Sequence, residues 1–132
     1  VITTPKEENT PTRLCMIERS LIKLIEQYKP DNIALEELFF ARNTTTAITV
    51  AEARGVLLLT ATKYCGSLFE YTPLQIKQAI TGYGKADKNQ VQQMVKMMLK
   101  LKSIPKPDDA ADALAVAITH GQTNKMANMF RI

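Results

Sequence analysis

Two kinds of segment alternate along the first half of the chain, and this alternation limits the possible folds more than any other feature of the sequence. Apolar residues recur at helical spacing over residues 13–28, with Thr12 as a candidate N-cap, and residues 44–64 form a second, longer helical pattern. Each pattern is followed by a short apolar run, at residues 32–36 and 68–71, of the length of a strand in a parallel sheet. This order of helix, strand, helix and strand predicts an α/β fold with right-handed connections.

The second half of the chain is expected to be mainly helical. A short helix is predicted over residues 73–80, followed by a loop with two glycines at 81–87 and by helices over 88–101 and 109–119. The helix over 88–101 is expected to bury one apolar face, made of Val91, Met94, Val95, Met98 and Leu101. From Gly121 onward the chain is polar, and we expect residues 121–132 to be a loose tail.

The chain is expected to form one domain over residues 1–132, with the beginning of that domain missing. Its 132 residues, 45% apolar and 23% charged, suit a single globular core and exclude intrinsic disorder. The β-branched run from Val1 to Thr4 is typical of the end of a strand. Two clear strands are too few for a stable sheet, because each would lack a partner at one edge.

The cysteines and the hydropathy indicate a cytoplasmic protein. Cys15 and Cys65 are expected to be free thiols in a reducing compartment, since the sequence shows no secretory leader. No apolar run approaches the roughly 18 residues that a membrane span needs. We therefore expect no membrane association.

Positive charge is concentrated in one stretch of the chain. Between Lys77 and Pro107, seven lysines stand against Asp87 alone, whereas the remaining residues carry a slight excess of acids. The seven are Lys77, Lys85, Lys88, Lys96, Lys100, Lys102 and Lys106. This concentration favours a polyanionic partner, with nucleic acid the leading candidate. A solvated lysine face on a helix explains the charge equally well.

Three acidic residues stand where carboxylates serve chemistry. Glu36 ends a predicted strand, and ligands gather at that end of the strands in open parallel sheets. Asp109 and Asp112 are three residues apart, which places both carboxylates on one helix face, where a divalent cation could offset their repulsion. The alternative is that acids near a helix N-terminus only stabilise the helix dipole, and His120 at the other end is expected to do the same.

Four stretches, taken together and in this order, resemble one family of nucleases. They are residues 33–39 (IALEELF), residues 52–56 (EARGV), residues 75–78 with 82–91 (QIKQ and GYGKADKNQV) and residues 109–115 (DAADALA). Over nearly its whole length the chain resembles the RuvC family of Holliday junction resolvases. The resemblance implies an α/β, ribonuclease H-like fold, a mixed sheet flanked by helices, whose N-terminal strands are missing from this chain.

A metal-dependent endonuclease is the activity that the resemblance implies. Glu36 is similar to the family's strand-borne catalytic glutamate, and Asp109 and Asp112 to its C-terminal catalytic carboxylates. The same three side chains would hold Mg²⁺, with Mn²⁺ as a possible substitute.

Four further residues are expected to contact DNA. By resemblance, Phe39 matches an aromatic residue near the crossover, and Lys77 and Lys88 match basic residues that line the DNA cleft. Lys85 lies on the glycine-containing loop, where a flexible backbone would let it follow a phosphate chain. The alternatives are a core position for Phe39 and an ordinary surface loop around Lys85.

The implied partners are four-way junction DNA, a second copy of the chain in a homodimer, and the branch-migration proteins RuvA and RuvB. The family also has a first catalytic aspartate, on a first strand, and this sequence has no residue that matches it. The chain alone is therefore expected not to cleave DNA, whereas the complete protein is expected to do so. A branched-DNA-binding module that does not cut, and a nuclease for RNA·DNA hybrids, are the alternatives.

Overall fold

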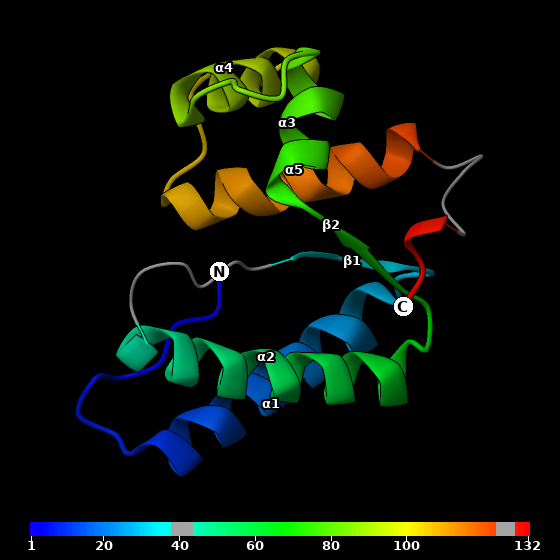
Figure 1. Cartoon of the computed structure of the whole chain (residues 1–132). Helices are drawn as coiled ribbons and strands as arrows, with labels where there is room; N and C mark the ends of the chain where they lie inside the picture. The colour runs from blue at the N-terminus through cyan, green and yellow to red at the C-terminus, as the bar shows by residue number, and fades with distance from the viewer. Residues whose placement is uncertain (38–43, 124–128) are drawn as a thin grey trace. The chain divides into compact units, whose positions relative to one another are not determined.

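The computed structural model describes residues 1–37, 44–123 and 129–132 of the chain (Figure 1). Its elements are α1 (Thr10–Tyr28), β1 (Ile33–Glu36), α2 (Thr44–Tyr64), β2 (Leu68–Tyr71), α3 (Pro73–Thr81), α4 (Lys88–Met98) and α5 (Asp108–Gln122). They confirm the predicted alternation of helix and strand. The described residues form two compact units, an α1–α2 unit drawn from residues 2–33 and 44–68 and an α3–α5 unit drawn from residues 1, 34–37, 69–123 and 129–132.

Strands β1 and β2 pair in parallel. The Ile33 N–H donates to the Ser67 carbonyl at 2.9 Å, and the Glu37 N–H donates to the Tyr71 carbonyl at 2.8 Å. Within the described residues these two strands make up the sheet. The residues of β1 are half-buried, because full burial of a parallel strand needs neighbours on both edges. Residues 1–4, expected to end a strand, are not in a strand.

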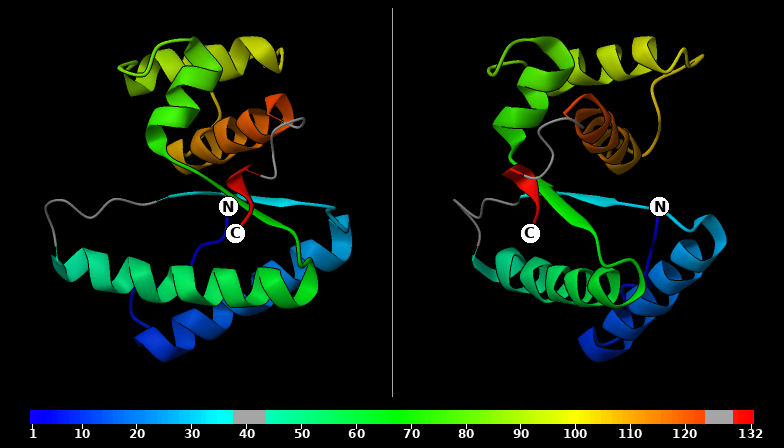
Figure 2. Two further views of the ribbon diagram at one scale, coloured as in Figure 1. Left: turned by 45° about the vertical axis from the view of Figure 1, so that its right-hand side comes forward. Right: turned by 90° about the vertical axis from the view of Figure 1, so that its right-hand side faces the viewer.

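Helices α1 and α2 lie side by side in the α1–α2 unit (Figure 2). The predicted cap at Thr12 was wrong: α1 begins at Thr10, and the Asn9 side chain accepts a hydrogen bond from the Thr12 N–H at 2.9 Å. Pro11 fits this first turn because its missing N–H would have no partner inside the helix. Cys15 and Cys65 are free thiols, as predicted.

The α3–α5 unit is built on a core shared by β2 and three helices. Its buried residues are Phe69, Tyr71, Ile76, Ile80, Val95, Ala115 and Val116. A reciprocal capping box between Thr72 and Gln75 fixes the start of α3 directly after β2. Gly82 ends α3 with φ 77°, a left-handed conformation that glycine adopts without strain.

The ends of α4 and α5 each differ from the prediction by three residues, whereas the end of α3 and the start of α5 differ by one. Helix α4 ends at Met98, because Lys100 turns left-handed and the Leu101 N–H bonds back to the Lys96 carbonyl at 2.9 Å. Met98, expected on the buried face, is consequently 37% exposed. Helix α5 continues to Gln122, past the expected end at residue 119.

Part of the expected loose tail is ordered against the core. Residues 121 and 122 belong to α5, and Phe130 packs against Tyr71 with ring centroids 4.9 Å apart. The backbone of Arg131 forms an isolated antiparallel β-bridge with that of Phe69. His120, in the last turn of α5, shares a hydrogen bond of 2.6 Å with the Tyr71 hydroxyl. Although the tail is polar on average, Phe130 has enough apolar surface to pack against the core.

Replacing Val95 with alanine is expected to destabilise the fold by about 2 kcal/mol, because it removes two methyl groups from a fully buried position and leaves a cavity. Urea unfolding followed by circular dichroism measures this change. Val1→Ala is the matched control, since Val1 is 74% exposed and should lose less than about 0.5 kcal/mol. Equal losses for the two variants would show that Val95 is not a core residue.

Candidate active site

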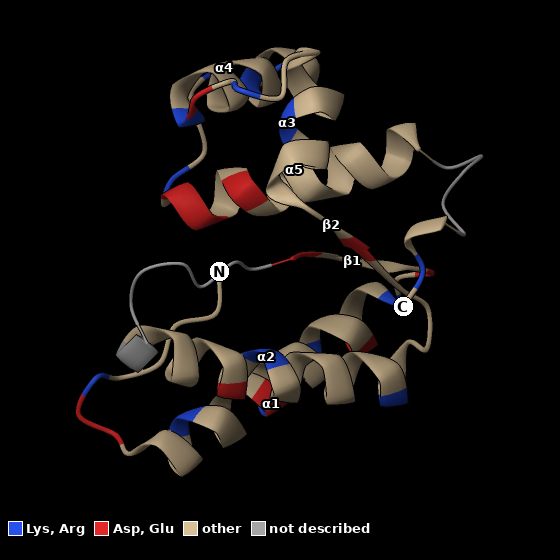
Figure 3. Ribbon diagram, in the orientation of Figure 1, with Lys and Arg blue, Asp and Glu red and all other residues tan. Residues whose placement is uncertain are grey.

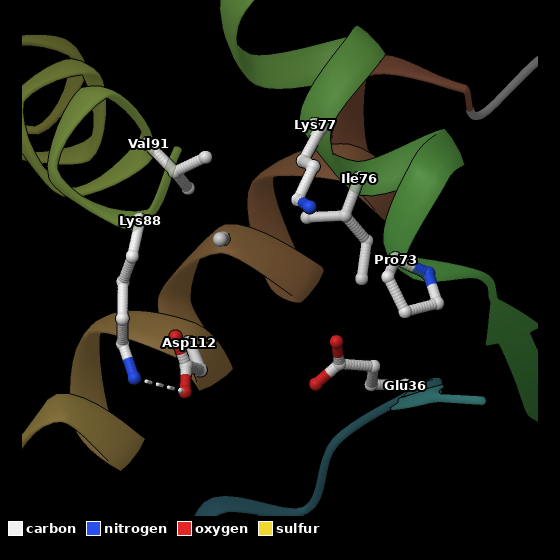
Figure 4. A pocket seen from close by; sticks show the side chains of 8 residues that line it. Glu36, Pro73, Ile76, Lys77, Lys88, Val91 and Asp112 are labelled. Carbon is white, nitrogen blue, oxygen red and sulfur yellow. Dashed lines mark ion pairs between the residues drawn. The ribbon is translucent and has the colours of Figure 1, made fainter. Parts of the chain in front are cut away.

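One pocket of about 290 Å³ in the α3–α5 unit gathers two carboxylates and two lysines (Figure 4). Glu36 reaches it from the end of β1, Lys77 from α3, Lys88 from α4 and Asp112 from α5. The apolar part of the lining consists of Pro73, Ile76, Val91 and Ala115. Residues up to 79 positions apart in the sequence thus converge on one concave surface, the usual form of a binding or catalytic site.

Local sequence explains how each helix delivers its side chain to the pocket. Lys88 is the first residue of α4, fixed by a capping box between Asp87 and Gln90. Asp112 lies one turn inside α5, and the small side chains of Ala111 and Ala115 are buried on that helix. The acids of the first two turns of α5 are clustered, as Figure 3 shows.

The environment of Glu36 disfavours a negative charge. Burial raises the pKa of its carboxyl above the usual value, and the nearby negative charge of Asp112 raises it further. The positive charges of Lys77 and Lys88 act in the opposite direction and are weaker. The pKa of Glu36 therefore stays raised although two lysines lie in the same pocket.

Lys88 bridges the start of α4 to the start of α5. Its Nζ lies 3.3 Å from Asp108 Oδ2 and 3.9 Å from Asp112 Oδ2, and Gln92 Nε2 donates to Asp108 Oδ1 at 3.3 Å. The hydrogen bond to Asp108 and the charge of Asp112 raise the pKa of Lys88, while Lys88 lowers the pKa of Asp108. The side chains of Lys88, Asp108 and Asp112 are each at least 40% exposed. Their ion pairs therefore contribute little to stability and mainly fix where the Lys88 ammonium lies.

The structure separates the predicted site residues into two groups. Glu36, Asp112, Lys77 and Lys88 line the pocket together. Asp109 is exposed on the first turn of α5 and does not line it, although its charge acts weakly on Lys88. Within the described part of the chain, no three His, Cys, Asp or Glu side chains are close enough together to hold a metal ion.

One other predicted DNA contact, Lys85, stands apart from this pocket. Lys85 is exposed on the loop between α3 and α4 and is not among the residues that line the pocket. Phe39 lies outside the described residues.

Asp108 and Gln92 are the residues that sequence reasoning missed. The sequence did not single out Asp108 among the acids at this helix N-terminus, whereas in the structure its carboxylate pairs with Lys88. The signal available in the sequence was spacing, because Lys88 and Gln92 lie four residues apart, as do Asp108 and Asp112, so each pair shares one helix face.

The solved structures that this chain resembles define its class. It matches the structure of Thermus thermophilus RuvC with a TM-score of 0.89 and 34% identity, covering 99% of this chain and 79% of that one. It also matches T. thermophilus RuvC in complex with a Holliday junction substrate, with a TM-score of 0.91 over the same shares of the two chains. The chain therefore has the ribonuclease H-like α/β fold of a class of nucleases, as predicted.

The particular family follows from the sequence comparisons. Residues 1–120 match the family model for the crossover junction endodeoxyribonuclease RuvC. The RuvC of Alkaliphilus oremlandii is 55% identical over 131 residues, which are 99% of this chain and 80% of that protein. That of Rubrobacter xylanophilus is 56% identical over 126 residues, or 96% and 70%. The chain belongs to the RuvC family. Among the described residues, no helix is long and apolar enough to span a membrane.

Proposed function

We propose that this protein is an endonuclease that resolves four-way DNA junctions in recombination and repair. The observation that carries the proposal is the convergence of Glu36 and Asp112 on one pocket, beside Lys77 and Lys88, in a chain of the RuvC family. Relatives that are 51–56% identical to this chain are named crossover junction endodeoxyribonucleases. One solved relative was determined with a Holliday junction substrate.

The donor chemistry of the pocket fits Mg²⁺, with Mn²⁺ as a substitute. Glu36 and Asp112 supply hard carboxylate oxygens, and the raised pKa of Glu36 reflects in part a repulsion that a divalent cation would remove. Asp109, exposed on the same helix as Asp112, is proposed as a third ligand that reaches the ion only when its side chain turns toward the pocket. When bound, the metal would supply activation of water and stabilisation of the leaving 3′ oxygen.

The chain's own residues hold the DNA strand for this reaction. Lys77 and Lys88 flank the carboxylates in the pocket and attract the phosphate that would otherwise be repelled by Glu36 and Asp112. Lys85, exposed on the adjacent loop, is proposed to contact the same strand further along, and Phe39 to contact the crossover. A homodimer would present two such sites to a two-fold junction, and RuvA and RuvB remain proposed partners.

A junction-binding experiment tests the proposed function. We expect the chain to bind a synthetic four-way junction at least about tenfold more tightly than linear duplex DNA or an RNA·DNA hybrid of equal length, at 0.1 M salt without divalent cations. Gel-shift titration measures the three affinities. Equal affinity for junction and duplex would contradict the proposal, and a preference for the hybrid would indicate a nuclease of the RNA·DNA class.

A cleavage experiment separates a resolvase from a binding module. The 132-residue chain, which has no match to the family's first aspartate, is expected to bind junctions in Mg²⁺ without cutting them. Denaturing gels of a labelled junction measure cutting. Symmetric cuts by this chain alone would show that the carboxylates at 36, 109 and 112 suffice.

A further inference from the structure

Asp108 stands beside the pocket carboxylates but takes no part in the function proposed above. Its Oδ2 lies nearer to Lys88 Nζ than the corresponding oxygen of Asp112 does, at 3.3 Å against 3.9 Å. Its other oxygen accepts a hydrogen bond from Gln92, a residue that is 9% exposed. Asp108 is thus held from the helix opposite and can in turn hold the Lys88 ammonium.

Lys88 and a metal ion at Asp112 would compete for the same carboxylate. The single positive charge of Lys88 lies within ion-pair distance of Asp112, with Nζ 3.9 Å from Oδ2. A divalent cation bound by Asp112 and Glu36 would repel that ammonium, which must then leave or find another anion. Asp108 is already in place, one helical turn before Asp112 on the same face of α5.

We propose that Asp108 is a positioning residue that retains Lys88 when a divalent cation binds at Asp112. This inference rests on the proposed metal site at Glu36 and Asp112 and adds to it a residue that the function does not otherwise require. Gln92 keeps the Asp108 carboxylate turned toward Lys88, and Lys88 stays at the edge of the pocket, where a DNA phosphate can reach it. Asp108 therefore lowers the cost of metal binding without contacting the metal.

The expected effect is on Mg²⁺ affinity. In Asp108→Asn, Lys88 keeps Asp112 as its ion-pair partner, so Mg²⁺ must displace the lysine from Asp112 to bind there. The dissociation constant for Mg²⁺ should therefore rise about two- to fivefold, the equivalent of one exposed ion pair. Chemical-shift titration of the ¹⁵N-labelled chain with MgCl₂ measures this constant from the amide signals of Ala111 and Asp112. In a chain that is also ¹³C-labelled, the Lys88 Cε–Hε signals report its movement directly.

A double-mutant cycle distinguishes this role from simple loss of negative charge. In a Lys88→Ala background, Asp108→Asn should change the Mg²⁺ dissociation constant by less than about 1.5-fold, because no ammonium is left to position. Lys102→Ala is the control background, since it removes the same charge from an exposed residue beyond the end of α4. In that background the full effect of Asp108→Asn should persist.

Three outcomes decide the proposal. The Lys88-dependent effect, together with Lys88 signals that shift on addition of Mg²⁺ only when Asp108 is present, supports it. An equal effect of Asp108→Asn with and without Lys88 overturns it and leaves the proposed nuclease function intact. If Glu36 and Asp112 bind no Mg²⁺ at all while the junction is still preferred over duplex, the metal site itself is wrong and this inference falls with it.

Discussion

Replacing Glu36 with glutamine is expected to weaken Mg²⁺ binding by at least about tenfold and, in the metal-free protein, to raise the melting temperature. Loss of a residue that only hydrogen-bonds to a metal ligand typically lowers metal affinity 10- to 100-fold. Loss of a ligand oxygen itself is expected to lower it at least as much. The same substitution is expected to stabilise the fold without Mg²⁺, because the negative charge that it removes is partly desolvated and is repelled by Asp112. Mg²⁺ titration and thermal unfolding at pH 7 measure the two effects.

The pH dependence follows from the raised pKa of Glu36. Because the folded state binds this proton more tightly than the unfolded state does, the ionised carboxylate costs stability at neutral pH, and that cost disappears as the pH falls through the raised pKa. Mg²⁺ needs the ionised form, so its affinity should begin to fall at a higher pH than for an ordinary glutamate. Asp112→Asn removes one cause of the shift and should move the pKa of Glu36 down.

Glu37→Gln is the matched control for both measurements. It makes the same chemical change one residue further along, and Glu37 is not among the residues that line the pocket. Its Mg²⁺ affinity and melting temperature should stay close to those of the unmodified chain. If Glu36→Gln instead lowered the melting temperature and left Mg²⁺ affinity unchanged, Glu36 would be a structural residue and not a metal ligand.

The part of the site that the sequence predicts well depends on strand ends and single helix faces. Glu36 could be placed because parallel strands present their carboxyl ends to a site, and Asp112 because its position inside α5 is poorly explained by the helix dipole. Helix α2 and strand β2 were predicted with the bounds that the structure shows, since long apolar patterns and short β-rich runs leave few alternatives.

The part that the sequence does not predict depends on how one helix packs against another. Which of the two adjacent acids, Asp108 or Asp109, faces α4 is decided by the rotation of α5 about its axis, and no periodicity in one helix specifies its rotation against a neighbour. The same holds for the lysines. Of the seven between Lys77 and Pro107, Lys77 and Lys88 line the pocket, whereas the other five lie on parts of the helices and loops that are not in its lining.

Removing both pocket lysines, by Lys77→Ala with Lys88→Ala, is expected to weaken junction binding on the order of 100-fold near 0.1 M salt. A lysine that neutralises one phosphate releases condensed counterions, which corresponds to roughly tenfold in affinity at this salt concentration. The slope of log affinity against log salt concentration should fall by about 1.8 for the double variant. Gel-shift titrations at four salt concentrations measure the affinity and the slope.

The two lysines should not contribute equally to this loss. Lys88 must give up its contacts with Asp108 and Asp112 before it can pair with a phosphate, so Lys88→Ala alone should cost less affinity than Lys77→Ala alone. Lys96→Ala with Lys102→Ala removes the same total charge from residues outside the pocket lining and should change the slope by much less. If this control pair lowered the slope as much as the pocket pair does, the DNA would be attracted by the general lysine excess of this stretch. The pocket would then have no special part in holding the strand, and Glu36 and Asp112 would lack the substrate contact that the nuclease proposal requires.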